Sequence, residues 1–179
     1  PTWSPDGTRI AFGRVGSNHN LFVMDADGAN IRQVTTGPEE KMQPAWSPDG
    51  RSLIYVQYSG LGHQGALSLH TVSVDGGAGT LLATCECQWP TYSPDGSSIA
   101  YVSWVPKDPG VLFPSVFLMR ADGSGGTNLL PGGMYGHWPR WVPDGSGILF
   151  SGYTGSGVAY DVYRMDADGT DLRRLTTSG

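Results

Sequence analysis

The sequence lacks the features that mark several common classes of protein. It contains no uninterrupted apolar run of about 18 residues, the length that a membrane-spanning helix requires. Its 11 Lys and Arg residues, in a chain of 179, are scattered rather than gathered in a stripe, which argues against nucleic-acid binding. No segment of useful length shows helical periodicity, so a helical solenoid is not expected.

Short signatures of catalysis are also missing. The chain has no Gly-x-Ser-x-Gly elbow, no His-Glu-x-x-His pair and no Gly-x-x-x-x-Gly-Lys loop. We therefore expect a chain without an active site of its own. A hydrolytic or lyase site stays open as an alternative, because several carboxylates and one histidine could face each other across a channel: Glu39, Glu40, Glu86, Asp108, Asp161 and His137.

Cysteine is scarce. Cys85 and Cys87 are the only two, and a single residue separates them. Residues i and i+2 of a strand share a face, but a disulfide at that spacing is usually strained, so we predict two free thiols in or beside a strand. A closed metal site would need further ligands, which this pair does not supply. We therefore expect no cofactor.

What the chain does contain is a repeat. A seven-residue pattern, Pro-x-Trp/Tyr-x-Pro-Asp-Gly, occurs at 1–7, 44–50, 90–96 and 139–145, so that successive copies begin 43, 46 and 49 residues apart. A unit of this length has to stack on its copies to bury its apolar faces. The sequence therefore predicts a single domain or segment of repeats 1–43, 44–89, 90–138 and 139–179.

Each repeat carries two turn signals and four strand-like segments. Ser4-Pro5-Asp6-Gly7 has the residues of a type I turn that rejoins a hairpin through a glycine of positive φ, and a second Asp-Gly turn follows at 25–28. Short apolar runs such as 10–12 and 21–24 flank these turns. Four antiparallel strands per repeat at this period predict an all-β fold, a β-propeller of four-stranded blades.

The acidic residues belong mostly to these turns. Ten of the sixteen Asp and Glu residues lie in the two turn families, so the net charge of −5 is weak evidence about partners. Asp-x-Asp-Gly also opens some calcium loops, but no downstream glutamate completes a cage here. We interpret these aspartates as turn-forming residues.

The repeats resemble the WD-like propeller repeats of the TolB family. The resemblance rests on the Pro-x-Trp-Ser-Pro-Asp-Gly turn, the Ile-Ala-Phe strand at 10–12, and the Met-Asp-Ala-Asp-Gly turns and Thr-Thr segments of the first and last repeats. It covers essentially the whole chain, although Val142 replaces the motif serine and the turn at 73–76 departs from the pattern. TolB propellers have six blades. Three arrangements therefore stay open: a closed four-bladed ring, part of a larger ring, and a ring completed by a second chain. Because the chain begins inside a motif, we expect part of a larger ring.

The resemblance also implies a function. TolB-like propellers serve as periplasmic platforms for binding partners, which implies a non-catalytic module that recognises a protein or peptide in the periplasm or outside the cell. Two alternatives follow from the same resemblance and from the aromatic residues. The chain could be the substrate-gating propeller of a prolyl-oligopeptidase-type hydrolase whose catalytic domain lies elsewhere, or a carbohydrate-binding propeller.

The loops indicate where binding would occur. In antiparallel blades the Asp-Gly turns share one end, while the loops at 59–65, 105–114 and 154–160, which differ in length and chemistry, share the other. Loops carried on a rigid scaffold are where specificity is built, so we expect the binding face at this variable end. Residues entering each first strand should lie nearest the central channel. The predicted binding residues are Met42, Gln43, Glu86, Gln88, Trp89, Tyr135, His137 and Trp138.

Trp89 and Trp138 have two interpretations. They could grip a peptide or a sugar ring, or they could plug the channel mouth. Three of the other tryptophans, Trp3, Trp46 and Trp141, recur at one repeat position and are expected to pack between blades. Of the remaining histidines, His70 is expected to be packed within a strand, and His19 and His63 to lie on exposed loops.

Overall fold

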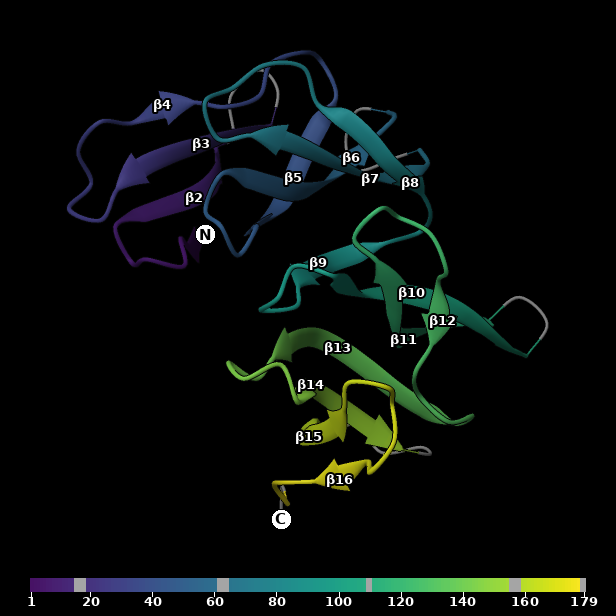
Figure 1. The fold of residues 1–179 in the computed structure, drawn as a ribbon. Coiled ribbons are helices and arrows are strands. Elements are labelled where there is room, and N and C mark those ends of the chain that lie inside the picture. The colour runs from purple at the N-terminus through teal and green to yellow at the C-terminus, as the bar shows by residue number, and fades with distance from the viewer. Residues whose placement is uncertain (15–18, 61–64, 109–110, 155–158, 178–179) are drawn as a thin grey trace. The chain divides into compact units, whose positions relative to one another are not determined.

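The computed structural model describes residues 1–14, 19–60, 65–108, 111–154 and 159–177 (Figure 1), without the side chains of residues 107, 108 and 111. His63, the Asp108 side chain and parts of the three variable loops therefore lie outside the described residues. The described secondary structure is β-strand throughout, and none of these residues is helical. The described part of the chain therefore contains no helix that is long and apolar enough to cross a membrane.

The strands form four antiparallel sheets, each of four strands, which confirms the predicted β-propeller blades. Blade 1 contains β1 (Thr2–Trp3), β2 (Arg9–Arg14), β3 (Asn20–Asp25) and β4 (Arg32–Gln33). Blade 2 contains β5 (Glu40–Trp46), β6 (Ser52–Tyr58), β7 (Leu67–Ser73) and β8 (Thr80–Thr84). Blade 3 contains β9 (Gln88–Tyr92), β10 (Ser98–Asp108), β11 (Val111–Arg120) and β12 (Thr127–Asn128). Blade 4 contains β13 (Met134–Trp141), β14 (Gly147–Thr154), β15 (Asp161–Asp166) and β16 (Arg173–Arg174).

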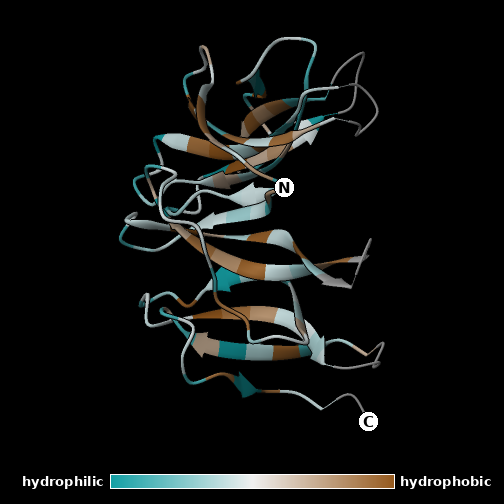
Figure 2. Cartoon of the chain, turned by 90° about the vertical axis from the view of Figure 1, so that its right-hand side faces the viewer, coloured by the Kyte–Doolittle hydropathy of each residue, from teal (hydrophilic) through white to brown (hydrophobic). Residues whose placement is uncertain are grey.

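The chain divides into two compact units, Pro1–Pro90 and Thr91–Gly179, called unit 1 and unit 2 below. Unit 1 holds blades 1 and 2, and unit 2 holds blade 4 with most of blade 3, because the boundary falls within β9. In both units the hydrophobic residues concentrate on the strands and the hydrophilic residues at the turns (Figure 2).

The Ser-Pro-Asp-Gly turns form as their residue types predict. The Gly7 amide donates to the Ser4 carbonyl at 2.9 Å, and Gly7 has a φ of 70°. The Asp6 carboxylate accepts hydrogen bonds from the Ser4 hydroxyl at 2.6 Å and from the Thr8 amide at 3.0 Å. These hydrogen bonds lower the pKa of Asp6 to about 2, and the bond from Ser4 has the largest effect. The carboxylates of this turn family therefore serve the turn itself.

Each unit has its own apolar core. In unit 1 the core joins Ala11, Leu21 and Val23 of blade 1 to Trp46 and Leu53 of blade 2. In unit 2 it includes Ala100, Val116, Leu130, Met134, Ile148, Phe150, Tyr163 and Met165, with Trp141 packed against it. These contacts confirm the interblade role of Trp46 and Trp141.

The same prediction is wrong for Trp3, whose side chain is 59% exposed. Trp46 is covered because its ring packs on blade 1, where its Nε1 donates to the Thr2 carbonyl at 3.0 Å. Within unit 1 no blade precedes blade 1, so nothing in this unit covers Trp3 in the same way.

Candidate functional site

Three of the predicted binding residues share an unusual backbone conformation. Gln43, Trp89 and Trp138 have φ values of 54°, 50° and 52°, in the left-handed region that non-glycine residues seldom adopt. Each one precedes the motif proline, a position that favours extended backbone. In β5 and β13 the pairing register also shifts, between Met42 and Ala45 and between His137 and Arg140, which marks a β-bulge. Bulges re-aim side chains, and such backbone strain clusters at functional sites.

In unit 1, Gln43 has a structural contact. Its Oε1 accepts a hydrogen bond from the Trp89 amide at 2.6 Å, so the side chain of β5 holds the backbone of β9. Met42, Gln88 and Trp89 are half-buried, and Glu86 is exposed on the bend between β8 and β9. Glu86 lies close enough to Tyr58 to help raise the pKa of that phenol, after burial and Glu40.

The two cysteines flank Glu86 and form a disulfide, so the prediction of two free thiols is wrong. Cys85 and Glu86 lie on a bend rather than in a strand, which brings the Cα atoms of Cys85 and Cys87 to 5.1 Å. This separation is within the range that a disulfide spans, whereas residues i and i+2 of an extended strand lie farther apart.

In unit 2 the predicted residues form part of a larger set of packed rings. We call this set the aromatic patch: Phe113, Tyr135, His137, Trp138, Tyr153 and Tyr160. The Tyr135 ring lies 4.4 Å from Phe113 and 4.5 Å from Tyr153, centroid to centroid. Tyr153 in turn lies 5.1 Å from Tyr160. The rings come from the variable ends of β11, β13 and β14 and from the segment before β15.

The aromatic patch has a buried base and an exposed edge. Tyr135 is 3% exposed, whereas Trp138 and Tyr160 are each 46% exposed. The rings of Trp138 and Tyr160 are 6.0 Å apart, and His137 lies 5.2 Å from the first and 5.7 Å from the second. Burial lowers the pKa of His137, which favours the neutral imidazole at pH 7. The patch is therefore a firmly supported, uncharged surface.

Sequence reasoning missed Phe113, Tyr153 and Tyr160 as site residues, although two of them fall within loops that it had singled out. Tyr153 could be found from the pairing of β13 with β14, since it lies directly opposite Tyr135. The bulge at Trp138 shifts this register by one residue, however, and an uninterrupted hairpin counted from the turn would place Thr154 there instead.

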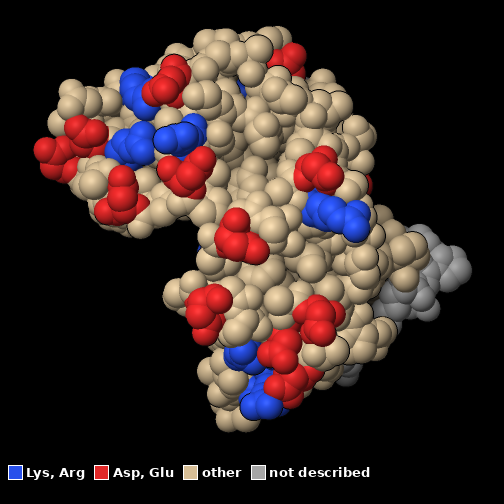
Figure 3. All heavy atoms as spheres, in the orientation of Figure 1, with Lys and Arg blue, Asp and Glu red and all other residues tan. Residues whose placement is uncertain are grey.

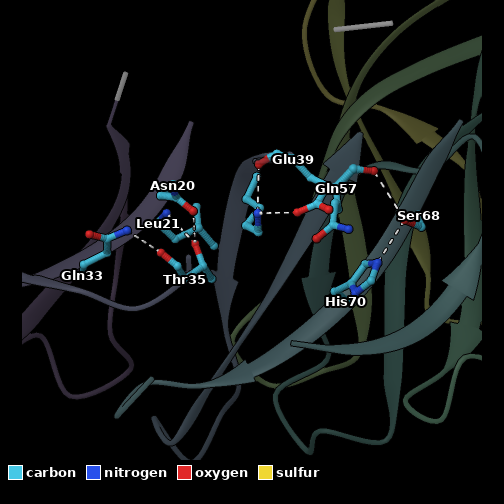
Figure 4. Close-up of polar contacts among 9 residues, drawn as sticks. Asn20, Leu21, Gln33, Thr35, Glu39, Gln57, Ser68 and His70 are labelled. Atoms are coloured by element: carbon cyan, nitrogen blue, oxygen red, sulfur yellow. Dashed lines mark hydrogen bonds and ion pairs between the residues drawn. The ribbon is translucent and has the colours of Figure 1, made fainter. Parts of the chain in front are cut away.

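Three of the carboxylates considered for catalysis, Glu39, Glu40 and Asp161, have structural partners. Burial and Lys41 lower the pKa of His70, and Glu39, drawn with it in Figure 4, is close enough to raise the pKa of that imidazole to a smaller extent. The Glu39 carboxylate is 3.4 Å from Lys41 Nζ, and the backbone carbonyl of Glu39 accepts a hydrogen bond from the same amine at 2.8 Å. Glu40 Oε1 lies 3.3 Å from His19 Nδ1. His70 stacks on Tyr55 at 5.6 Å, which confirms its predicted packing.

Asp161 accepts a hydrogen bond from a threonine hydroxyl, as the neutral side chain of Asn20 does in blade 1. Its carboxylate pairs with Arg174 and accepts from the Thr176 hydroxyl at 3.1 Å, while Thr176 Oγ1 also accepts from the Val162 amide. In blade 1, Asn20 accepts from Thr35, whose Oγ1 accepts from the Leu21 amide (Figure 4). An amide in the equivalent place thus makes the same contact between the third strand and the segment that follows the fourth.

Cation sites are not evident in the described part of the chain, where no three His, Cys, Asp or Glu side chains are grouped to hold a metal ion. On the face shown in Figure 3, acidic and basic side chains are interspersed rather than separated into patches of one sign.

Antiparallel four-stranded blades, whose strands are joined by two families of Asp-Gly turns, define a β-propeller repeat protein. The chain belongs to the TolB beta propeller domain family, whose model matches residues 13–179. This confirms the resemblance drawn from the repeat motifs.

The sequence relatives described here align with only part of the chain. The "Uncharacterized peptidase YuxL" of Bacillus subtilis is 41% identical over 56 residues, 30% of this chain and 8% of the relative. A "Tol-Pal system protein TolB" of Legionella pneumophila is 35% identical over 82 residues, 43% of this chain and 19% of the relative. The crystal structure of TolB from Acinetobacter baumannii has a TM-score of 0.76 at 21% identity, over 97% of this chain and 42% of that one, which shows the shared fold. The chain thus spans a minor part of each of these proteins.

Proposed function

We propose that this chain is a non-catalytic binding module that recognises a protein or peptide through the aromatic patch. The observation that carries the proposal is the pair of half-exposed rings, Trp138 and Tyr160. Both contact His137, and Tyr160 also packs on Tyr153, which in turn packs on the buried Tyr135. Tyr and Trp supply large contact areas at little entropic cost and are enriched among residues that dominate binding energy. Rings held by packed neighbours lose less freedom on binding, which improves affinity.

The proposed location is the periplasm or another compartment outside the cytoplasm. Membership of the TolB propeller family supports it, and so does the disulfide between Cys85 and Cys87, because such bonds persist in oxidising compartments and are rare in the cytosol. The remaining predicted residues, Met42, Gln43, Glu86, Gln88 and Trp89, are proposed as secondary contacts in unit 1.

Two substitutions in the aromatic patch and one matched control outside it test the proposal. A library of random displayed peptides is selected against the wild-type protein, and the affinity of a selected peptide is measured for Trp138→Ala, Tyr160→Ala and Trp3→Ala. Removal of either patch ring is expected to weaken binding at least about tenfold. Trp3 is an exposed tryptophan of unit 1, outside the patch, so its removal is expected to leave the affinity unchanged. Equal binding by a folded Trp138→Ala, Tyr160→Ala double variant would refute the assignment.

The second candidate is the accessory propeller of a prolyl-oligopeptidase-type hydrolase, which the peptidase relative from Bacillus subtilis favours. In the full-length gene product, this function predicts hydrolysis of short peptides with a size limit that depends on the propeller. Absence of peptidase activity in that product would exclude it. A carbohydrate-binding propeller, the third alternative, predicts glycan-array binding that both ring substitutions abolish.

A further inference from the structure

Unit 1 contains an arginine that joins its two blades at the end where the Asp-Gly turns lie. Arg9 is the first residue of β2, and its Cζ atom lies 4.8 Å from the centroid of the Trp46 ring in blade 2. Its Nη2 donates to the Gly50 carbonyl at 2.9 Å. The guanidinium thus rests on an aromatic face and binds the next turn, a favourable cation–π arrangement. Its charge also helps to lower the pKa of Asp6.

Unit 2 repeats the backbone of this arrangement. Ser98 follows its turn as Arg9 follows the first one, and the Ser98 amide donates to the Ser93 hydroxyl at 2.9 Å, as the Arg9 amide does to Ser4. Trp141 and Gly145 stand where Trp46 and Gly50 stand. The spacing between blades is also the same. A Cβ atom built on Gly145 lies 3.8 Å from Pro94 Cδ, and one on Gly50 lies 3.9 Å from Pro5 Cδ.

A main difference between the units at this place is the side chain that follows the turn. Where unit 1 has the Arg9 guanidinium, unit 2 has the short hydroxymethyl group of Ser98, and a pocket of about 490 Å³ opens there. Ser98, Trp141 and Gly145 line it, together with Leu118 and the carboxylates of Asp95 and Asp144. This volume is within the range of ligand sites.

The charges at this pocket favour a cation. Its described lining includes two aspartates and no Lys or Arg. Hydrogen bonds from Ser93 and Ser97 lower the pKa of Asp95 to about 2, and bonds from Ser146 lower the pKa of Asp144, so both are ionised at neutral pH. Arg164 is near enough to contribute to the second shift, but it is engaged with Asp166 at 3.0 Å.

We propose that this pocket binds an arginine side chain of a partner protein, whose guanidinium packs on Trp141 and donates to the Gly145 carbonyl as Arg9 does in unit 1. The site lies at the opposite end of β13 from the aromatic patch, so it is a second contact surface and does not depend on the proposed function. A lysine would satisfy it less well, because an ammonium lacks the planar fork that can stack and donate together.

The test uses capped amino acids as probes and the indole N–H signals of the isotopically labelled protein as the readout. N-acetyl-arginine methylamide is expected to shift the Trp141 signal with saturation in the millimolar range. The corresponding lysine and citrulline compounds, one lacking the fork and the other the charge, are expected to bind at least about fivefold more weakly. Equal shifts with all three compounds would overturn the proposal.

Substitutions at matched positions make the test decisive. Ser98→Arg supplies the missing guanidinium within the chain and is expected to abolish binding of the arginine probe. Thr127→Arg adds the same charge in unit 2 at an exposed position of β12 that does not line the pocket, and is expected to retain binding to within about threefold. Arg9→Ser opens the equivalent space in unit 1 and is expected to make the Trp46 signal respond to the probe. Unchanged binding by Ser98→Arg would overturn the proposal.

The source of the guanidinium is tested separately. Free L-arginine carries both an α-ammonium, which Asp95 and Asp144 attract, and an α-carboxylate, which they repel, so it is expected to bind no more tightly than the capped compound. Tighter binding of free arginine would show a site for the amino acid and overturn the assignment to a partner protein. Retained arginine binding in Trp138→Ala would show that this pocket acts independently of the aromatic patch.

Discussion

Gly136 provides a sharp test of how the aromatic patch is supported. It lies on β13 between Tyr135 and His137, directly opposite Gly152 of β14. A methyl group on Gly136 would lie 2.7 Å from Leu130 Cδ1, 2.8 Å from Val116 Cγ2 and 3.1 Å from Phe150 Cδ2. Val116 is 0% exposed and Phe150 is 2% exposed, so neither can move into solvent. Crowding a packed core in this way costs about 1–3 kcal/mol.

The control for Gly136→Ala is Gly132→Ala. A Cβ atom on Gly132 would meet nothing within 4 Å, and its backbone is not left-handed. Both substitutions remove the same freedom from the unfolded chain, which by itself stabilises by about 0.4–1 kcal/mol. The difference between the two variants therefore isolates the crowding.

Urea unfolding followed by tryptophan fluorescence measures this difference. Gly136→Ala is expected to unfold about 1–3 kcal/mol more easily than Gly132→Ala, which corresponds to a midpoint lower by about 1 M. A midpoint equal to or above that of Gly132→Ala would refute the inferred packing beneath the patch.

Three further predictions concern the turns and the strand entries. Asp95→Asn is expected to reduce the loss of stability that the wild-type protein shows between about pH 4 and pH 2. The pKa of this carboxyl falls from 3.8 to about 2 on folding, so it stabilises the protein above this window and ceases to do so as it is protonated. Thermal melts at several pH values measure this, and the same pH dependence in variant and wild type would contradict the prediction. Gln43→Leu removes the acceptor of the Trp89 amide and is expected to lower the free energy of unfolding in urea by about 1–3 kcal/mol. An unfolding midpoint equal to that of the wild type would contradict this. Trp46→Phe loses the hydrogen bond to the Thr2 carbonyl and is expected to cost about 1 kcal/mol, measured in the same way, whereas a stabilised variant would contradict the assignment.

The blades could be predicted because the residues of each repeat determine the local structure of its turns and strands. Ser4, Asp6 and Gly7 carry the turn in their side-chain chemistry and backbone freedom, and these interactions span only a few residues. The packing of Trp46 could be predicted in the same way, since a repeated position in a repeated unit meets a repeated neighbour. Trp3, at the same repeat position, is 59% exposed, so the repeat position alone does not decide the burial of a side chain.

The candidate site could be predicted only in part. Tyr135, His137 and Trp138 were found because they lie at the start of the first strand of a blade, at a position that the repeat defines. Their neighbours Tyr153 and Tyr160 were not found, because the register that brings them together depends on the bulge at Trp138. The disulfide was missed for a related reason, since it depends on a bend at Cys85 that the strand pattern does not reveal.

The sequence alone determined the family, the four-stranded blades and the turns, because these follow from short-range interactions repeated along the chain. Only the tertiary structure decided which side chains meet between neighbouring strands and blades. The aromatic patch depends on a one-residue shift of register, and the pocket beside Trp141 exists because Ser98 leaves open the space that Arg9 fills in unit 1. Both depend on distances between residues far apart in the chain, which the spacing of motifs does not specify.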